Sequence, residues 1–259
     1  MEARNILISL AIKYNGDWHK IYATLQDKKH IPESEEVEET VSSLGDDIKA
    51  ITIVDKEYPE SMRNSVRPPF VLFYKGDISL IQNENIATVY GRRSEYRDYE
   101  AVYNAVDNIT TAAKEKNGVV LTSGSQGIST MTIKMAISKD VKNIVVLAGG
   151  LNEVYPSENK ELFNEVIEKG GLVMTEYSPK TLPERDHFPE RMRIMSWLGK
   201  KTVVVDASQM SGTAVGVQFA LSYGKDILVV PGPSFDDSLN NRLLEQGATP
   251  FVRREQLFD

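Results

Sequence analysis

The spacing of hydrophobic positions changes once along the chain. In residues 1–48 the apolar side chains recur every three or four positions, which is the period of an amphipathic helix. Tyr14-Asn15-Gly16-Asp17 interrupts the pattern with turn-forming residues. Two helical stretches therefore flank this break, and residues 1–48 are expected to form a small helical cap. The acidic segment from Pro32 to Glu39 is expected to be a solvated helix face or a linker.

From Ile51 onward, short apolar runs alternate with amphipathic segments, which predicts an α/β fold. Four of the expected strands run into small or polar residues, in the stretches Ile86 to Arg93, Val119 to Gly127, Asn143 to Gly150 and Thr202 to Thr213. The expected helices are Tyr96–Lys116, Ser129–Lys139, Ser157–Lys169, Phe188–Leu198, Ser211–Tyr223 and Ser238–Gln246. Residues 49–259 should therefore form an extended Rossmann-like domain with a doubly wound, mostly parallel sheet.

The carboxyl ends of parallel strands share one edge, so the residues after these four strands should meet along one crevice. Glycine at such a strand end lets backbone N–H groups approach a phosphate closely at the start of the next helix. This arrangement predicts a phosphate-bearing ligand.

Composition narrows the classes of function. The chain has 259 residues, of which 41% are hydrophobic and 26% charged, and it contains no cysteine and three histidines. Disulfides and thiolate metal sites are therefore excluded, and the histidines are too scattered to predict a metal cluster. We expect no metal and no cofactor. No apolar run approaches the roughly 20 residues that span a bilayer, and the polar N-terminus does not resemble a secretion signal, so a cytoplasmic protein without membrane contact is expected.

The net charge of −7 argues against a large nonspecific surface for nucleic acid, because affinity for phosphates grows with the number of phosphates neutralised. A local basic pocket on an acidic protein is compatible with this charge.

The first candidate site follows the strand that ends at Gly91. Arg92 and Arg93 present guanidinium groups that match phosphate oxygens, although a solvated or salt-bridged pair is the alternative. Arg97 could widen the positive region or form a surface ion pair. At the next strand end, Ser123, Gly124, Gln126 and Gly127 suit an anion, or else form a tight turn without a ligand.

A second candidate site precedes a predicted helix. Arg185, Phe188, Arg191 and Arg193 combine cations with an aromatic ring, which is the chemistry of single-strand binding. As alternatives, Phe188 could anchor the helix as a hydrophobic staple, and Arg193 could pair with Asp206 or Glu176.

Ser211, Gly212 and Thr213 open another predicted helix after the strand that ends at Asp206. They either face the crevice as a phosphate-binding loop or only cap the helix. The carboxylate of Asp206 could accept a sugar hydroxyl or hold a nearby arginine.

Ten short motifs occur in an order that resembles the DNA-processing protein A (DprA/Smf) family. They are YPESM, PPFVLFYKG, GRR, SGSQGI, LAGGLNEVYPSEN, GGLVMTEY, HFPERMRI, SGTAVGVQFA, VVPG and NRLLEQGA, between Tyr58 and Ala248. The resemblance implies an extended Rossmann-like domain that binds single-stranded DNA, pairs as a homodimer and loads a RecA-type recombinase. It also implies that Arg185 holds the strand and that Phe188 stacks on a base.

Three departures from the family pattern lie in the ligand-binding loops. Arg92 replaces a small hydroxyl residue, the glycine-rich stretch is one residue shorter and ends in Ser129, and an RNR motif has become Arg191-Met192-Arg193. The chain ends at Asp259, which leaves no room for the winged-helix domain of many relatives. A divergent member without this domain is therefore expected.

Two classes of function remain. The leading one is a nonenzymatic protein of DNA processing and recombination that binds single-stranded DNA. The alternative is a sensor, sequestering protein or hydrolase of small nucleotides, in which Glu176 or Asp206 would be the general base. Neither closely spaced paired carboxylates nor a nucleophile elbow is present in the sequence, which favours the first class.

Overall fold

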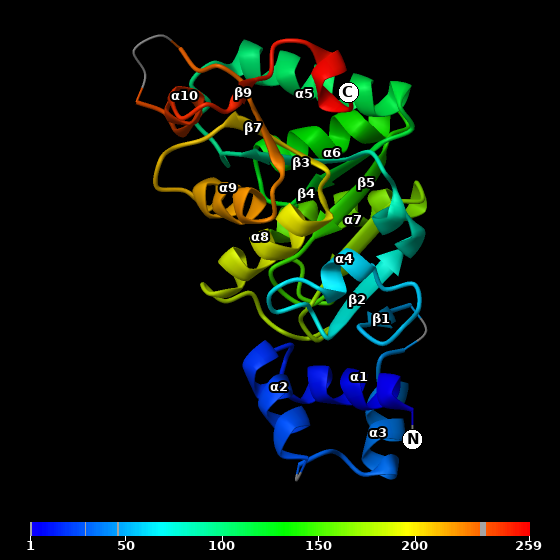
Figure 1. The fold of residues 1–259 in the computed structure, drawn as a ribbon. Helices are drawn as coiled ribbons and strands as arrows, with labels where there is room; N and C mark the ends of the chain where they lie inside the picture. Colours follow the sequence, from blue (N-terminus) through cyan, green and yellow to red (C-terminus); the bar gives the residue numbers. More distant parts are fainter. Residues whose placement is uncertain (1, 29, 46, 234–236) are drawn as a thin grey trace.

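Nine strands form one sheet within the residues that the structure, a computed structural model, describes: 2–28, 30–45, 47–233 and 237–259. Their spatial order is β1-β2-β6-β5-β4-β3-β7-β8-β9 (Figure 1). The strands are β1 (Lys49–Thr52), β2 (Val71–Gly76), β3 (Ile86–Gly91), β4 (Val119–Thr122), β5 (Lys142–Val146), β6 (Leu172–Thr175), β7 (Lys201–Asp206), β8 (Asp226–Val229) and β9 (Thr249–Pro250). The expected α/β fold with a mostly parallel sheet is confirmed.

The order of the strands places a crevice at the middle of the sheet. All strands from β6 to β9 in this order are parallel, whereas β1 and β2 join the edge in antiparallel pairs. The chain adds β4, β5 and β6 on one side of β3, then crosses to β7 and β8 on the other side. Neighbouring crossovers therefore diverge where β3 and β7 end, and ligands of open α/β sheets bind outside such a point.

Helices cover both faces of the sheet (Figure 1). They are α1 (Ala3–Lys13), α2 (Trp18–Asp27), α3 (Ser34–Ser42), α4 (Glu60–Arg63), α5 (Tyr99–Glu115), α6 (Ile128–Ser138), α7 (Lys160–Glu168), α8 (His187–Leu198), α9 (Gly212–Ser222) and α10 (Leu239–Glu245). The side chains of β3 alternate between the faces, so Val89 packs in the cluster beneath α5 and α6, and Tyr90 packs in the cluster beneath α8. No helix of the described residues is both long enough and apolar enough to cross a bilayer.

The N-terminal helices share their core with the sheet. Leu7, Ile8 and Leu10 of α1 belong to one buried cluster with Phe73 of β2 and Val173 of β6. Figure 1 shows these helices below the sheet, next to β1 and β2. The sequence predicts a domain boundary at residue 48, and one buried apolar cluster contains residues from both sides of it.

The loop between α1 and α2 docks on the segment after β6. The Asn15 Oδ1 atom accepts a hydrogen bond from Ser178 Oγ at 3.0 Å. Gly16 has a φ of +77°, and a Cβ atom there would lie 2.3 Å from the carbonyl oxygen of Glu176. Only glycine fits this left-handed and closely packed position.

We expect Gly16→Ala to lower the free energy of unfolding by about 2–4 kcal/mol, because it adds a backbone clash to the strain of a positive φ. Gly224→Ala is the matched control, since Gly224 has a φ of +67° but no atom within 4 Å of its Cβ position. Its cost should be about 1 kcal/mol. Denaturant unfolding followed by circular dichroism measures both losses, and equal losses would show that this docking contact contributes nothing.

Candidate nucleic-acid interface

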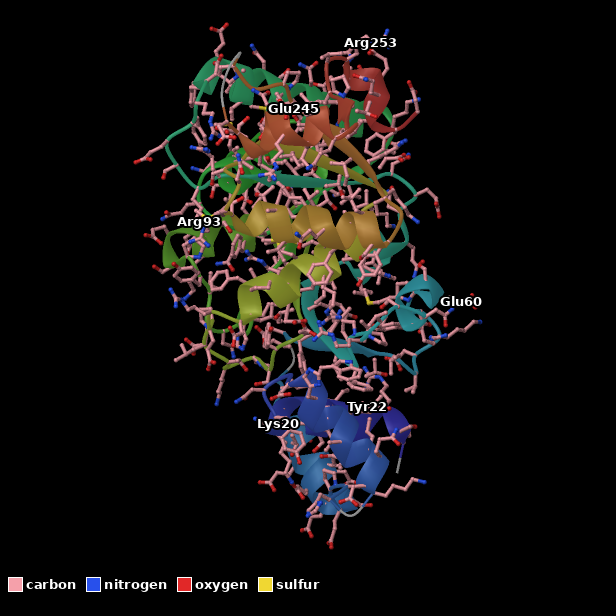
Figure 2. The ribbon with its side chains drawn as sticks, turned by 60° about the vertical axis from the view of Figure 1, so that its left-hand side comes forward. Lys20, Tyr22, Glu60, Arg93, Glu245 and Arg253 are labelled. Atoms are coloured by element: carbon pink, nitrogen blue, oxygen red, sulfur yellow. The ribbon has the colours of Figure 1, made fainter. Side chains whose placement is uncertain are left out.

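An open cavity of about 520 Å³ lies beside the ends of β3 and β7. The first turn of α8, the loop after β3 and the loop that leads into α9 enclose it. Its lining residues are Arg93, Phe188, Pro189, Gln209, Met210, Ser211, Gly212, Ala214 and Val215. We call this cavity the strand groove. Figure 2 shows Arg93 at the molecular surface on this side of the protein.

Two arginines lie close to the ring of Phe188. The Arg93 guanidinium carbon lies 5.6 Å from the ring centroid, and that of Arg191 lies 5.3 Å from it. Phe188 and Arg191 are three residues apart on α8, so they share one face of the helix. Arg93 reaches the same ring from the loop after β3. The fold thus assembles one aromatic surface and two cations from segments almost 100 residues apart.

Arg191 is a buried cation without a carboxylate partner among the described residues. Arg191 is only 3% exposed, and its Nη1 atom donates a hydrogen bond to the carbonyl oxygen of Ser123 at 2.9 Å. The Nε atom has no hydrogen-bond partner. Burial, reinforced by the nearby charge of Arg93, lowers the pKa of Arg191 to about 10. A buried charge of this kind is costly, and an anion in contact with it would reduce that cost.

Three serine hydroxyls cluster beside this charge. Ser123 Oγ lies 2.9 Å from Ser125 Oγ and 3.0 Å from Ser129 Oγ. The helix α6 begins here after Gly127, whose φ is +75° and whose Cβ position is 2.4 Å from the carbonyl oxygen of Arg93. Glycine is therefore required at position 127, where α6 begins in close contact with the backbone of Arg93. Hydroxyls and a helix N-terminus add polarity that suits an anion.

Asp206 occupies the central crevice together with two arginines. Its Oδ1 atom lies 3.2 Å from Arg92 Nε and 2.9 Å from Arg97 Nη1, and its Oδ2 atom accepts from the backbone N–H of Arg97 at 3.1 Å. Of the roles considered for Asp206, the structure shows the one in which it holds nearby arginines. Arg92 is correspondingly ion-paired, whereas Arg93 extends toward the strand groove.

Arg193 lies on the opposite face of α8 from the strand groove. Its Nη2 atom binds Glu176 Oε2 at 2.7 Å, its Nε atom binds Glu190 Oε2 at 3.1 Å, and its Nη1 atom donates to the carbonyl oxygen of Arg67. Burial raises the pKa of Glu176, and the charge of Arg193 offsets part of that rise. Glu176 and Glu190 outweigh the effect of burial and raise the pKa of Arg193. Of the two partners that the sequence suggested for Arg193, the structure shows Glu176 and not Asp206, and Glu190 is a further acidic partner.

Three residues singled out in the sequence hold the loops that surround the site. A Cβ atom at Gly91 would come 2.3 Å from Ile128, so glycine allows α6 to pack against the end of β3. Gly124 has a φ of +63° and packs against Phe163. Gln126 is exposed and donates to Glu158 Oε1 at 3.4 Å.

The loop before α9 contributes both lining and buried residues. Ser211 and Gly212 line the strand groove, whereas Thr213 is buried. The Ser211 hydroxyl donates to the carbonyl oxygen of Ser208 at 2.7 Å and makes no cap bond to α9. Arg185 is exposed and pairs with no carboxylate of the described residues. It lies in the segment that leads into α8.

Sequence reasoning did not foresee that Arg191 would be buried or that Ser129 would join the serine cluster. The spacing of Phe188 and Arg191 carried part of this signal, since it places both on one helix face. Within the parts of the chain that the structure describes, no group of three histidine, aspartate or glutamate side chains is placed to hold a metal ion.

A family profile and curated relatives match most of this chain. The profile of the family described as DNA recombination-mediator protein A matches residues 49–259. The DNA processing protein DprA of Bacillus subtilis (strain 168) is 31% identical over 214 residues, which cover 82% of this chain and 71% of that protein. The same protein from Streptococcus pneumoniae (strain ATCC BAA-255 / R6) is 30% identical over 202 residues, or 77% of this chain and 69% of the relative.

Two solved structures share the fold. The X-ray structure of DNA processing protein A from Streptococcus pneumoniae superposes with a TM-score of 0.77 at 24% identity, covering 98% of this chain and 92% of that one. The Helicobacter pylori DNA processing protein A, whose structure is described in terms of its single-stranded DNA binding mode, has a TM-score of 0.70 at 20% identity, covering 82% and 94%. With a family profile that spans most of the chain and relatives at about 30% identity, this protein belongs to the DNA recombination-mediator protein A family, also called DprA or Smf.

Proposed function

We propose that this protein binds single-stranded DNA in the strand groove and acts in DNA processing and recombination. The observation that carries the proposal is the buried guanidinium of Arg191, which pairs with no carboxylate of the described residues and lies 5.3 Å from the centroid of the Phe188 ring. A phosphate of the strand would supply the missing negative charge, and a base would stack on Phe188.

The other cations extend this contact. Arg93 approaches the ring of Phe188 from the loop after β3, and Arg185 is exposed in the segment just before α8. Neither pairs with a carboxylate of the described residues, so both are available for the phosphates on either side of the stacked base. The Helicobacter pylori relative, which binds single-stranded DNA, supports the same ligand class.

The remaining parts of the proposal concern partners and chemistry. We propose that the protein works in the cytoplasm as a homodimer and delivers the bound strand to a RecA-type recombinase, a role that the family's description as a recombination mediator supports. We also propose that it is not an enzyme. Both candidate general bases support this, because Asp206 and Glu176 are each held in ion pairs with arginines.

Fluorescence anisotropy with labelled oligonucleotides of increasing length tests the strand-binding proposal. The expected result is binding that strengthens with length up to the site size, weakens steeply with salt, and is not displaced by duplex DNA or mononucleotides. Absence of strand binding, or displacement by one mononucleotide or cyclic nucleotide, would instead identify a small-nucleotide protein. Recombinase loading is then measured as strand exchange on DNA coated with a single-strand binding protein.

Phe188→Ala should weaken binding of a single strand by roughly 5- to 150-fold, because stacking of one base on an aromatic ring contributes about 1–3 kcal/mol. Tyr103→Ala is the control, since Tyr103 is an exposed tyrosine on α5 that does not line the groove. Anisotropy titrations at one salt concentration compare both variants with the parent. Equal affinity of Phe188→Ala and the parent would remove Phe188 from the interface.

Arg191→Met should stabilise the free protein and weaken strand binding, because it removes a buried charge that only the ligand neutralises. The melting temperature should rise, while the dependence of the logarithm of the binding constant on that of the salt concentration should fall by about one phosphate contact.

Arg193→Met is the matched comparison for Arg191→Met. It leaves the buried Glu176 carboxylate without its partner, so it should lower the free energy of unfolding by roughly 3–5 kcal/mol. Calorimetry measures the change in stability of both variants, which should be an increase for Arg191→Met and a decrease for Arg193→Met. A destabilised Arg191→Met with unchanged salt dependence would mean that Arg191 is a structural residue.

A further inference from the structure

A second cavity lies on the other side of α8. Its volume is about 430 Å³, and it is enclosed by the loop between α1 and α2, the segment after β6 and the first turns of α8. His187, Glu190 and Arg193 line it from α8, whereas Phe188 and Pro189 face the strand groove. The start of this helix therefore separates two cavities, and adjacent residues 187 and 188 present one ring to each. We call this second cavity the inner pocket.

One wall of the inner pocket is a stacked pair of rings. Tyr177 and His187 have centroids 3.9 Å apart and an interplanar angle of 22°. Tyr177 is buried, whereas His187 is only partly buried and lines the pocket. The pair thus offers a flat, supported surface for a third planar ring.

The polar lining of the pocket includes five carboxylate residues, which are Asp17, Glu176, Glu184, Asp186 and Glu190. Its cations are engaged, since Arg193 binds Glu176 and Glu190, Arg67 binds Glu190, and Lys20 binds Asp17. The side chains of Glu184 and Asp186 line the same pocket and pair with no cation of the described residues.

Glu176 is a buried carboxylate of this pocket with an unused hydrogen-bond acceptor. It lines the pocket, is 5% exposed, and its Oε1 atom has no hydrogen-bond partner. A carboxylate accepts hydrogen bonds and donates none when ionised. The pocket therefore suits a planar ligand that donates N–H groups.

We propose that the inner pocket binds a nucleobase with an exocyclic amino group, as a second base of the strand held in the strand groove. The inference rests on the proposed function. Cytosine and adenine present amino donors on their exposed edges, whereas thymine presents a carbonyl acceptor in the same place, which the carboxylates would repel. The base stacks on His187 and directs its amino group toward the acidic wall.

The start of α8 provides the route between the two cavities. Arg185 is exposed in the segment just before the helix, so its guanidinium can neutralise the phosphate that crosses from one side to the other. A strand that passes over this end of the helix places successive bases on opposite sides of it. Phe188 receives a base of any type, and His187 receives the base that is selected.

Oligo(dC) and oligo(dT) of matched length test the inference, because both are pyrimidine strands and differ at the amino or carbonyl group. The parent protein should bind oligo(dC) roughly tenfold more tightly than oligo(dT). His187→Ala should remove this preference while keeping the affinity for oligo(dT). Phe188→Ala should weaken both strands by the same factor and keep the preference.

The variants separate failure of this inference from failure of the proposed function. Equal affinity of the parent for both oligonucleotides, or a preference that survives in His187→Ala, would overturn the inference while leaving strand binding intact. If neither oligonucleotide binds, the proposed function fails, and deoxycytidine and thymidine are titrated as free nucleosides. Binding of deoxycytidine alone, lost in His187→Ala, would then identify a pocket for a free amino nucleoside, whereas binding of neither would overturn the pocket.

Discussion

The distribution of charge around α8 is the constraint on which the rest of the site depends. Two arginines of this helix are buried to the same extent, but only Arg193 has carboxylate partners. Arg193 and Glu176 compensate each other and join α8 to the end of β6. Arg191 has only a backbone carbonyl, so its charge is left for a ligand. In the function that we propose, Arg193 thus serves stability and Arg191 serves binding, although the two residues are separated by only one position.

The central crevice of this sheet is closed to an anion by its own ion pairs. Many Rossmann-like proteins hold a phosphate where neighbouring crossovers diverge. Here Arg92 and Arg97 bind Asp206 at that point, whereas Arg93 and the buried Arg191 lie against the ring of Phe188 and pair with no carboxylate of the described residues. The strand groove that we propose as the binding site accordingly lies beside α8, where an aromatic ring is available for stacking. This position favours an extended strand over a dinucleotide buried in the crevice.

An acidic protein can still bind a polyanion when its few free cations are concentrated. The chain carries a net charge of −7, yet Arg93 of the strand groove and the buried Arg191 lie beside one ring and pair with no carboxylate of the described residues. Screening shortens the reach of the distant acidic surface at physiological salt, while contacts at short range persist. The acidic lining of the inner pocket has the opposite function, since it repels phosphate and admits the amino edge of a base.

The sequence by itself determined the α/β class, the helix positions and the motifs that indicate the family. Hydrophobic periodicity is a local property of the sequence, and it predicts where strands and helices form. The helix expected to begin at Phe188, for example, begins at His187 as α8. Contacts between distant segments could not be predicted from the sequence. The same arginine type at positions 191 and 193 has opposite roles, and only the packing of α8 against β6 and the loop after β4 decides which one meets a carboxylate. The inner pocket also required tertiary structure, because its walls come from the N-terminal helices and from α8, which no local pattern connects.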